Sequence, residues 1–259
     1  MSTNPGAAGP LADVEAEAER ILAAATVERV TVRLLGGVAI ARHRHGPVPE
    51  ALRRSYADID LVVQRHHDRP LRMTLERLGY EPNRRFNSLH GDRRLLFYDH
   101  TNGRQLDVFV GHFQMCHTLE LNDRLALDPV TLCPTDLLLT KLQVQEITHK
   151  DLVDSVTLLH EHEIAPDDRG DTLGLDRLVE LTSREWGWYT TVSDNLARLV
   201  PAADELLDPG AAAVVADRIA GIAAAITTAP KSLRWRARAR LGRRVPWYEL
   251  PEEVARPVG

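Results

Sequence analysis

The chain has 259 residues, 44% of them hydrophobic and 27% charged, and its formal net charge is −5 at pH 7. This length and composition exclude a disordered chain and a fibrous repeat, and they allow one large domain or two modest ones. Because a chain of this size needs no disulfide stapling and holds only two cysteines, we expect a reduced, cytoplasmic setting.

Two stretches bear on targeting and membranes. Residues 1–10 are small and polar and lack the basic patch and apolar run of a secretory signal. The Ala-rich stretch 210–229 is interrupted by Asp217 and Arg218, which favours a helix of a soluble protein over a membrane span. We therefore expect no membrane partner.

The first half of the chain predicts a mixture of helices and strands. Helices are expected at 11–25 and 70–78, and strands at 30–35, 58–63, 94–98 and 105–110. The segment 42–54 contains Gly46, Pro47 and Pro49, which mark a loop. Asn102-Gly103 between the last two strands predicts a hairpin, since both central residues of a type I′ turn need positive φ.

From Pro134 onward the pattern is almost entirely helical. Helices are expected at 135–146, 150–162, 175–199 and 211–227, with breaks near 166–174 and 209–210. The fold class is therefore α+β, with a mixed sheet flanked by helices followed by an all-helical part. We place the domains at 1–130 and 131–259.

Gly36-Gly37 directly follows the first strand and precedes a helix. Without Cβ atoms, this backbone can approach a phosphate closely, and the helix offers free N–H groups to it. Taken alone, a glycine pair after a strand is more often a tight turn.

Three aspartates fall on two predicted strands. Asp58 and Asp60 are two residues apart, so both side chains point to one face of a strand. Asp107 interrupts an otherwise apolar strand, where burying a charge is costly unless it is paired or bound to metal. A simpler alternative is that these side chains face water. Asp58 and Asp60 would then lie at the exposed start of a strand, and Asp107 on the outer face of an edge hairpin.

Together these features resemble the polymerase-β-type nucleotidyltransferase superfamily. The resemblance rests on Gly36-Gly37, the run 55–60 (SYADID) and Asp107, and it covers about residues 30–110. The chain is most similar to minimal bacterial branches, which are the toxin-like abortive-infection group and the aminoglycoside and lincosamide adenylyltransferases. Gly37 replaces the commoner serine of the family's Gly-Ser pair, and the loop-rich segment before Asp58 leaves the placement of Ser55 open.

The resemblance implies an enzyme that moves a nucleoside monophosphate from an NTP to an acceptor and releases pyrophosphate. Gly36, Gly37 and Ser55 would then contact the nucleotide. Asp58, Asp60 and Asp107 would be the catalytic carboxylates and hold two Mg²⁺ ions, since this ion prefers carboxylate and phosphate oxygens. A non-catalytic nucleotide-binding module is the alternative from another functional class.

The helical half offers two further nucleotide-binding candidates. Lys141 and the run beginning at Lys150-Asp151 resemble the helix lysine and the Lys-Asp helix of the toxin-like branch. Lys141 and Asp154 would lie on nearly opposite sides of one straight helix, so a bend near Thr148 is required. The alternative is a lysine whose stem packs on the surface while its ammonium group stays in water.

The prediction of the acceptor rests on the C-terminal basic segment 231–244, which holds seven basic residues and no acidic one. At helical spacing Arg236, Arg240, Arg243 and Arg244 cluster, and such a stripe can follow a phosphate backbone. It is equally compatible with a solvated helix or with pairing to the acidic remainder. If it binds nucleic acid, an RNA acceptor such as tRNA is favoured over an antibiotic. An antitoxin partner would accompany the toxin-like branch.

Histidines and cysteines give no ordered zinc spacing. The groups inspected are Cys116 with His112 and His117, and His160 with His162. Because two histidines at i and i+2 of a helix cannot face one metal, the sequence does not favour a zinc site.

Overall fold

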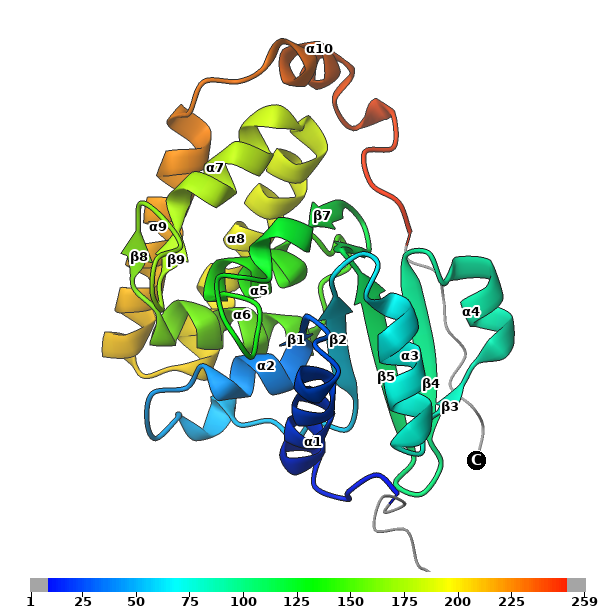
Figure 1. The fold of residues 1–259 in the computed structure, drawn as a ribbon. Coiled ribbons are helices and arrows are strands. Elements are labelled where there is room, and N and C mark those ends of the chain that lie inside the picture. Colours follow the sequence, from blue (N-terminus) through cyan, green and yellow to red (C-terminus); the bar gives the residue numbers. More distant parts are fainter. Residues whose placement is uncertain (1–8, 251–259) are drawn as a thin grey trace, which may run out of the picture.

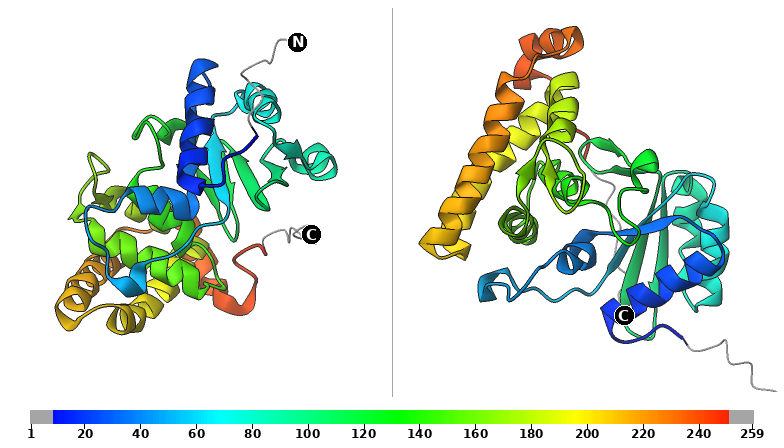
Figure 2. Two further views of the ribbon diagram at one scale, coloured as in Figure 1. Left: turned by 90° about the horizontal axis from the view of Figure 1, so that it is seen from below. Right: turned by 60° about the vertical axis from the view of Figure 1, so that its left-hand side comes forward.

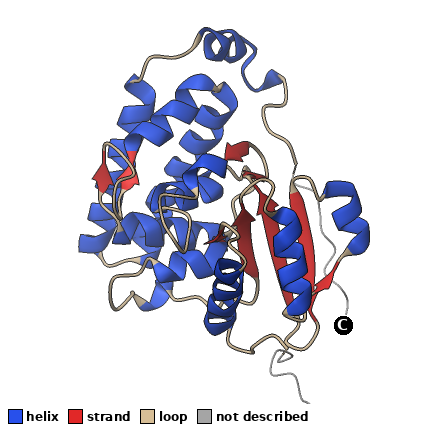
Figure 3. Cartoon of the chain, viewed as in Figure 1, coloured by secondary structure: helices blue, strands red, loops and turns tan. Residues whose placement is uncertain are grey.

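The structure is a computed structural model that describes residues 9–250 (Figure 1). It is a mixed α+β fold with 53% helix and 14% strand (Figure 3). A five-stranded sheet has the order β1-β2-β5-β4-β3. Its strands are β1 (Val32–Leu35), β2 (Ile59–Val63), β3 (Glu81–Pro82), β4 (Arg94–Asp99) and β5 (Arg104–Val110). Only β2 and β5 are parallel, so the sheet is mixed as predicted.

The two faces of the sheet differ in chemistry because strand side chains alternate. One face is apolar and fully buried, with Leu34, Leu61, Leu95 and Val108 at its centre. The helices α1 (Val14–Val27) and α3 (Asp68–Arg77) lie over the same side of this sheet (Figure 1). The opposite face carries the predicted carboxylates.

The helical half packs against that opposite side through α2 (Gly36–Arg42). Figure 2 shows these helices beside the sheet. They are α5 (Pro134–Leu142), α6 (His149–Glu161), α7 (Leu175–Arg184), α8 (Trp186–Leu206), α9 (Pro209–Thr228) and α10 (Leu233–Leu241). One hydrophobic core runs through both halves, from Leu34 in β1 to Leu199 in α8 and Ile222 in α9. The division at residue 130 stays a prediction, and the backbone at 130–132 hydrogen-bonds with Leu34.

Short elements complete the described chain. They are the helix α4 (Arg84–His90), the strands β6 (His112–Gln114), β7 (Thr118–Glu120), β8 (Ile164–Ala165) and β9 (Leu173–Gly174), and the 3-10 turns at Glu50–Leu52, Asn122–Arg124 and Gly242–Arg244. None of the regular elements among them was expected from the sequence, because strands of two or three residues and a helix of seven carry too little periodicity.

Two local predictions are wrong. The helix expected over 175–199 is broken at Glu185, whose backbone is extended, so that α7 and α8 are separate helices. Burial of Trp188, whose ring lies 5.1 Å from that of His117, accompanies this break. The β4–β5 hairpin forms, but its loop has four residues and only Gly103 (φ 63°) has positive φ, so it is not a type I′ turn.

Helix α9 is long and apolar enough to cross a membrane by length and composition. Its buried residues, Ala212, Val215, Ile219, Ile222 and Ile226, recur every three or four positions and so form one face. That face belongs to the protein core that α9 shares with the other helices. One face of α9 is therefore packed in the core, and 28% of its most apolar 18-residue window is buried.

Candidate active site

The parallel pairing of β2 with β5 brings two of the predicted carboxylates together. Asp60 and Asp107 are register partners, so their side chains project from the same face of the sheet. Asp107 is buried and Asp60 is half-buried. Two like charges side by side repel, and this arrangement is costly unless a cation or a proton lies with them.

Gly36 lies directly against the carboxylate of Asp60. It has φ 70°, and a Cβ added there would lie 2.0 Å from Oδ2 of Asp60. A side chain at residue 36 would therefore fill the space that the carboxylate occupies. The neighbouring Gly37 is also crowded, because a Cβ added there would lie 2.3 Å from the ring of Tyr56.

The pKa of Asp60 is raised to about 7. Burial is the largest cause, and the neighbouring charge of Asp107 is the next. Lys141 and Arg94 act in the opposite direction. The group therefore sits in an environment where a bound cation would favour its ionised form.

Arg94 and Gln105 hold Asp107 in this structure. Nε and Nη2 of Arg94 each lie 2.8 Å from Oδ1 of Asp107, and Nε2 of Gln105 donates to Oδ2 at 2.7 Å. Sequence reasoning missed both residues. The available signal was the hairpin register, which places Arg94 opposite Phe109 and on the same face as Asp107.

Asp58 lies immediately before β2 rather than inside it. It is half-buried and accepts a hydrogen bond from the backbone N–H of Gln105 at 3.4 Å. Its charge contributes to the raised pKa of Asp60, so the two carboxylates are near each other. Ser55, by contrast, is exposed in the loop before the strand and does not line the cavity described below.

Lys141 reaches the same region from α5. Its Nζ lies 3.1 Å from Oδ1 of Asp151 and 2.9 Å from Oδ2 of Asp154. Burial opposes the charge of Lys141, but these two carboxylates outweigh it and raise the pKa of the amine. The required bend exists: α5 ends at Leu142, and α6 begins after Thr148, which forms a capping box with Asp151.

A cavity of about 260 Å³ joins these groups. Its polar lining residues are Asp60, Arg94, Asp107, Thr140, Lys141 and Asp151, and Gly36 forms part of its wall. Acidic and basic side chains therefore face one space from both the sheet and the helices. Such a space suits a ligand that carries phosphate groups together with divalent cations.

A second group of side chains follows the loop that precedes β2. Nη2 of Arg44 donates to the hydroxyl of Tyr56 at 2.7 Å, and the guanidinium of Arg54 lies 5.4 Å from the centroid of the same ring. Arg54 also pairs with the buried Asp154. The basic loop 42–54 is thus tied to α6, which sequence reasoning did not foresee.

The predicted basic segment forms α10 and the turn that follows. Arg243 pairs with Asp194 at 2.7 Å, and Arg238 donates to backbone carbonyls of residues 242, 245 and 246. Within residues 9–250, the side chains of Arg236, Arg240 and Arg244 make no hydrogen bond or ion pair. Part of the stripe is therefore used internally and part is free.

Comparison with known proteins gives a likeness to solved structures alone. No protein-family model matches the chain, and no curated protein matches it. Among solved structures, the chain aligns with the crystal structure of an antigenic nucleotidyltransferase-like protein from Paracoccidioides brasiliensis. The identity is 13% and the TM-score 0.43, and the alignment covers 86% of this chain and 96% of that chain. At this level the likeness supports no functional inference, so function has to be argued from the site.

Proposed function

We propose that this chain is a nucleotidyltransferase that moves an NMP from an NTP to an acceptor hydroxyl and releases pyrophosphate. One observation carries the proposal: Asp60 and Asp107 are paired in register on one face, beside a glycine that leaves no room for a side chain. The fit of this site to Mg²⁺ is supported by its donor atoms, which are hard carboxylate oxygens. The raised pKa of Asp60 shows that their negative charges are not fully compensated in the absence of a cation.

In this proposal Asp58, Asp60 and Asp107 hold two Mg²⁺ ions. When bound, the ions would neutralise charge on the α-phosphate and on the attacking and leaving oxygens. The backbone at Gly36 and Gly37 allows close approach of the triphosphate, which a Cβ at either position would obstruct.

The remaining side chains supply positioning and charge. Nζ of Lys141 lines the cavity and is suited to a phosphate oxygen, and Asp151 orients it. Arg94 contacts Asp107 through Nε and Nη2, and Asp107 would need to exchange this contact in order to hold a divalent cation. Beside the acceptor hydroxyl, the carboxylate of Asp107 would also help to take its proton. Little covalent work is left for the protein beyond positioning and electrostatics.

RNA, such as tRNA, is the favoured acceptor. Support comes from Arg236, Arg240 and Arg244, which make no ion pair within the described residues. A protein acceptor and a cationic antibiotic are the other acceptors. The antibiotic would need an acidic pocket, whereas RNA needs a basic surface. An antitoxin partner and a cytoplasmic location belong to the same proposal.

The proposal is tested by incubating the full chain and Mg²⁺ with each α-labelled NTP. Total RNA, the protein itself and a panel of aminoglycosides are offered as acceptors. We expect one acceptor to take the label with release of pyrophosphate, and the Asp60→Asn and Asp107→Asn variants to lose at least about 100-fold of the rate. The matched control is Asp68→Asn on α3, outside the cavity, which should keep the wild-type rate.

A non-catalytic nucleotide-binding module is the second candidate. It is favoured by the double contact of Arg94 with Asp107, which already neutralises one carboxylate. In that case the chain binds NTP and Mg²⁺ but releases no pyrophosphate with any acceptor. Equal turnover by Asp60→Asn and wild type would likewise remove the catalytic proposal.

A further inference from the structure

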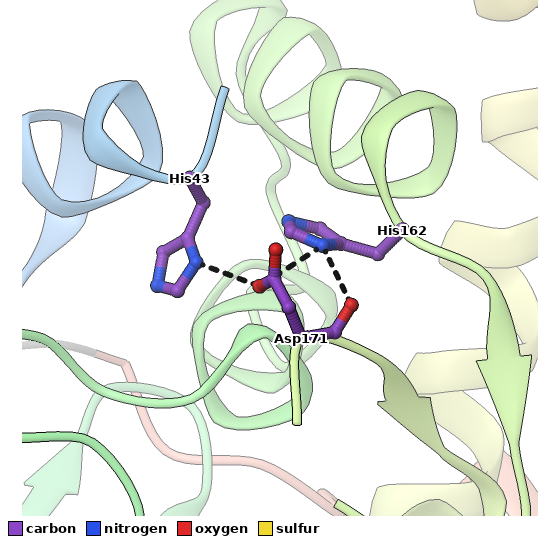
Figure 4. A group of neighbouring side chains, drawn as sticks. All are labelled: His43, His162 and Asp171. Carbon is purple, nitrogen blue, oxygen red and sulfur yellow. Dashed lines mark hydrogen bonds and ion pairs between the residues drawn. The ribbon is translucent and has the colours of Figure 1, made fainter. Parts of the chain in front are cut away.

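Three segments that are far apart in the sequence meet at a cluster of histidines around Asp171 (Figure 4). His43 follows α2, His162 follows α6, and Asp171 lies in the loop between β8 and β9. Nδ1 of His43 lies 3.1 Å from Oδ1 of Asp171, and Nδ1 of His162 lies 3.2 Å from the same oxygen. Nε2 of a fourth residue, His45, contacts the other carboxylate oxygen.

We propose that His43, His162 and Asp171 bind a divalent transition-metal ion of the Zn²⁺ class, with His45 in the fourth position. The site does not depend on the proposed enzymatic function.

The spacing of the donor atoms fits such an ion. One donor atom from each of His43, His162 and Asp171 lies within 4.8 Å of the others. Tetrahedral Zn²⁺ with bonds of about 2.0–2.1 Å to nitrogen and oxygen separates its ligands by roughly 3.3 Å. The two nitrogen–oxygen distances of 3.1 and 3.2 Å are close to this edge length.

The hydrogen bonds of His43 leave a lone pair that faces a carboxylate. Its Nε2 lies 2.7 Å from Oγ1 of Thr131 and 3.2 Å from the carbonyl oxygen of Leu132. The Thr131 hydroxyl donates to Asp128 and the Leu132 carbonyl can only accept, so Nε2 of His43 carries the hydrogen. In the neutral ring, Nδ1 therefore presents its lone pair to Oδ1 of Asp171. Two acceptors at this distance repel unless a cation or a proton lies between them.

The same hydrogen bonds have the form of a metal site's outer shell. A metal-bound histidine commonly donates its other ring N–H to a backbone carbonyl or a neighbouring oxygen, which fixes the tautomer. Thr131 and Leu132 accept this hydrogen from His43. The ring is thus already oriented with Nδ1 toward Asp171.

His162 adds a buried polar group with an incomplete set of partners. Its side chain is 0% exposed, and its Nε2 has no hydrogen-bond partner within residues 9–250. Its Nδ1 is the ring nitrogen that faces Asp171, at 3.2 Å from Oδ1, so this nitrogen is the one placed to ligate an ion.

The chemistry of the cluster separates it from the Asp60–Asp107 site. Imidazole nitrogens suit Zn²⁺ and similar transition metals, whereas a purely carboxylate set suits Mg²⁺. The adjoining pocket, of about 460 Å³, is lined by His43, His45 and Asp171, so an ion can enter from solvent.

A metal here would join the two halves of the chain. It would connect the end of α2 with the end of α6, and α2 begins at Gly36 beside Asp60. Seven helical residues at about 1.5 Å each place the two ends of α2 roughly 10 Å apart. The ion would therefore restrain the helix that positions the glycine wall of the candidate active site.

The test measures metal binding and stability, with no need for enzyme activity. The full chain is stripped with a chelator and titrated with Zn²⁺ against a chromophoric competitor, and with Co²⁺ as a spectroscopic substitute. We expect one equivalent per chain, a tetrahedral Co²⁺ spectrum and a higher Tm with Zn²⁺. Asp171→Asn and His43→Gln should each weaken Zn²⁺ binding by at least about 100-fold.

The control is Asp167→Asn in the same loop, whose carboxylate pairs with Arg169 and lies outside the cluster. It should bind Zn²⁺ like wild type. If Asp171→Asn fails to fold, the comparison rests on His43→Gln and on the Co²⁺ spectrum of wild type. The proposal is overturned if wild type does not bind Zn²⁺ stoichiometrically, or if both ligand variants bind it as tightly as wild type. The cluster would then be a hydrogen-bonded network without a metal ion.

Discussion

Asp60 shows how much of a candidate site depends on one carboxyl group's surroundings. Its sequence neighbours place it on a strand, but its raised pKa comes from burial and from Asp107, which is 47 positions away along the chain. Without a bound cation this environment favours the protonated acid. Ionising Asp60 in the folded protein therefore costs free energy, and a bound divalent ion would remove this cost.

This cost predicts a pH dependence of stability in the chelated protein. The folded pKa of Asp60, about 7, exceeds the ordinary value of 3.8, so the folded state binds more protons between these limits. Stability contributed by this group is complete below about pH 4 and is lost as pH rises to 7. The loss is at most about 4 kcal/mol, because one pKa unit is worth about 1.36 kcal/mol.

Urea denaturation of the chelated chain between pH 4 and 8 measures this loss. Asp60→Asn has no charge to bury, so its curve should be flatter than wild type and its stability at pH 8 higher. Asp68→Asn serves as the surface control and should follow wild type. Parallel curves for wild type and Asp60→Asn would contradict the raised pKa.

At the scale of elements, helix and strand types were predictable but their ends and partners were less so. The hydrophobic pattern located β1, β2, β4, β5 and the longer helices, because each buries one periodic face. It did not separate α7 from α8, since no Gly or Pro stands at Glu185, whose backbone is extended. The bend between α5 and α6 is held by Asn195, whose side chain donates to the carbonyls of Leu142 and Val144.

The turn from β1 into α2 gives a matched comparison of two glycines. Gly36 (φ 70°) and Gly103 (φ 63°) have similar left-handed backbones, but only at Gly36 would a Cβ meet neighbouring atoms within 4 Å. Alanine at positive φ costs roughly 1–2 kcal/mol. We therefore expect Gly103→Ala to lose about that much, and Gly36→Ala to lose more because Asp60 must move.

The measurement is the free energy of unfolding of both variants, together with NTP turnover. Gly36→Ala should also lose activity, whereas Gly103→Ala should keep it. Equal losses of stability in the two variants would mean that residue 36 has room that the structure does not show.

At the scale of the whole molecule, charge is divided between a mostly acidic chain and a basic C-terminal segment. The structure uses Arg243 to pair with Asp194 and leaves Arg236, Arg240 and Arg244 without ion pairs in the part described. The segment after α10 then returns to the turn between β6 and β7, where the Glu249 backbone N–H donates to the carbonyl of Cys116. The arginines without ion pairs thus lie on α10 and on the turn after it, in a segment that contacts both halves.

If these arginines bind tRNA, affinity depends steeply on ionic strength. Each phosphate contact contributes about 0.7–0.9 to the slope of log K against log salt, so changing all three to Gln should lower it by roughly 2–3. Arg243→Gln is the control, since that side chain is already paired, and it should change the slope by less than one. A wild-type slope near zero would argue against RNA and favour a small acceptor.

The sequence by itself determined the element types, the α+β class and the candidates Gly36, Asp58, Asp60 and Asp107, because periodicity and local residue chemistry act over a few positions. Only the tertiary structure decided that Asp60 and Asp107 are register partners, that Arg94 reaches Asp107, and that Ser55 stays outside the cavity. The histidine cluster around Asp171 was likewise decided by the tertiary structure, since its members come from three segments whose spacing along the chain matches no metal-binding motif. The physical reason is that strand pairing and helix packing bring together residues whose separation along the chain carries no signal.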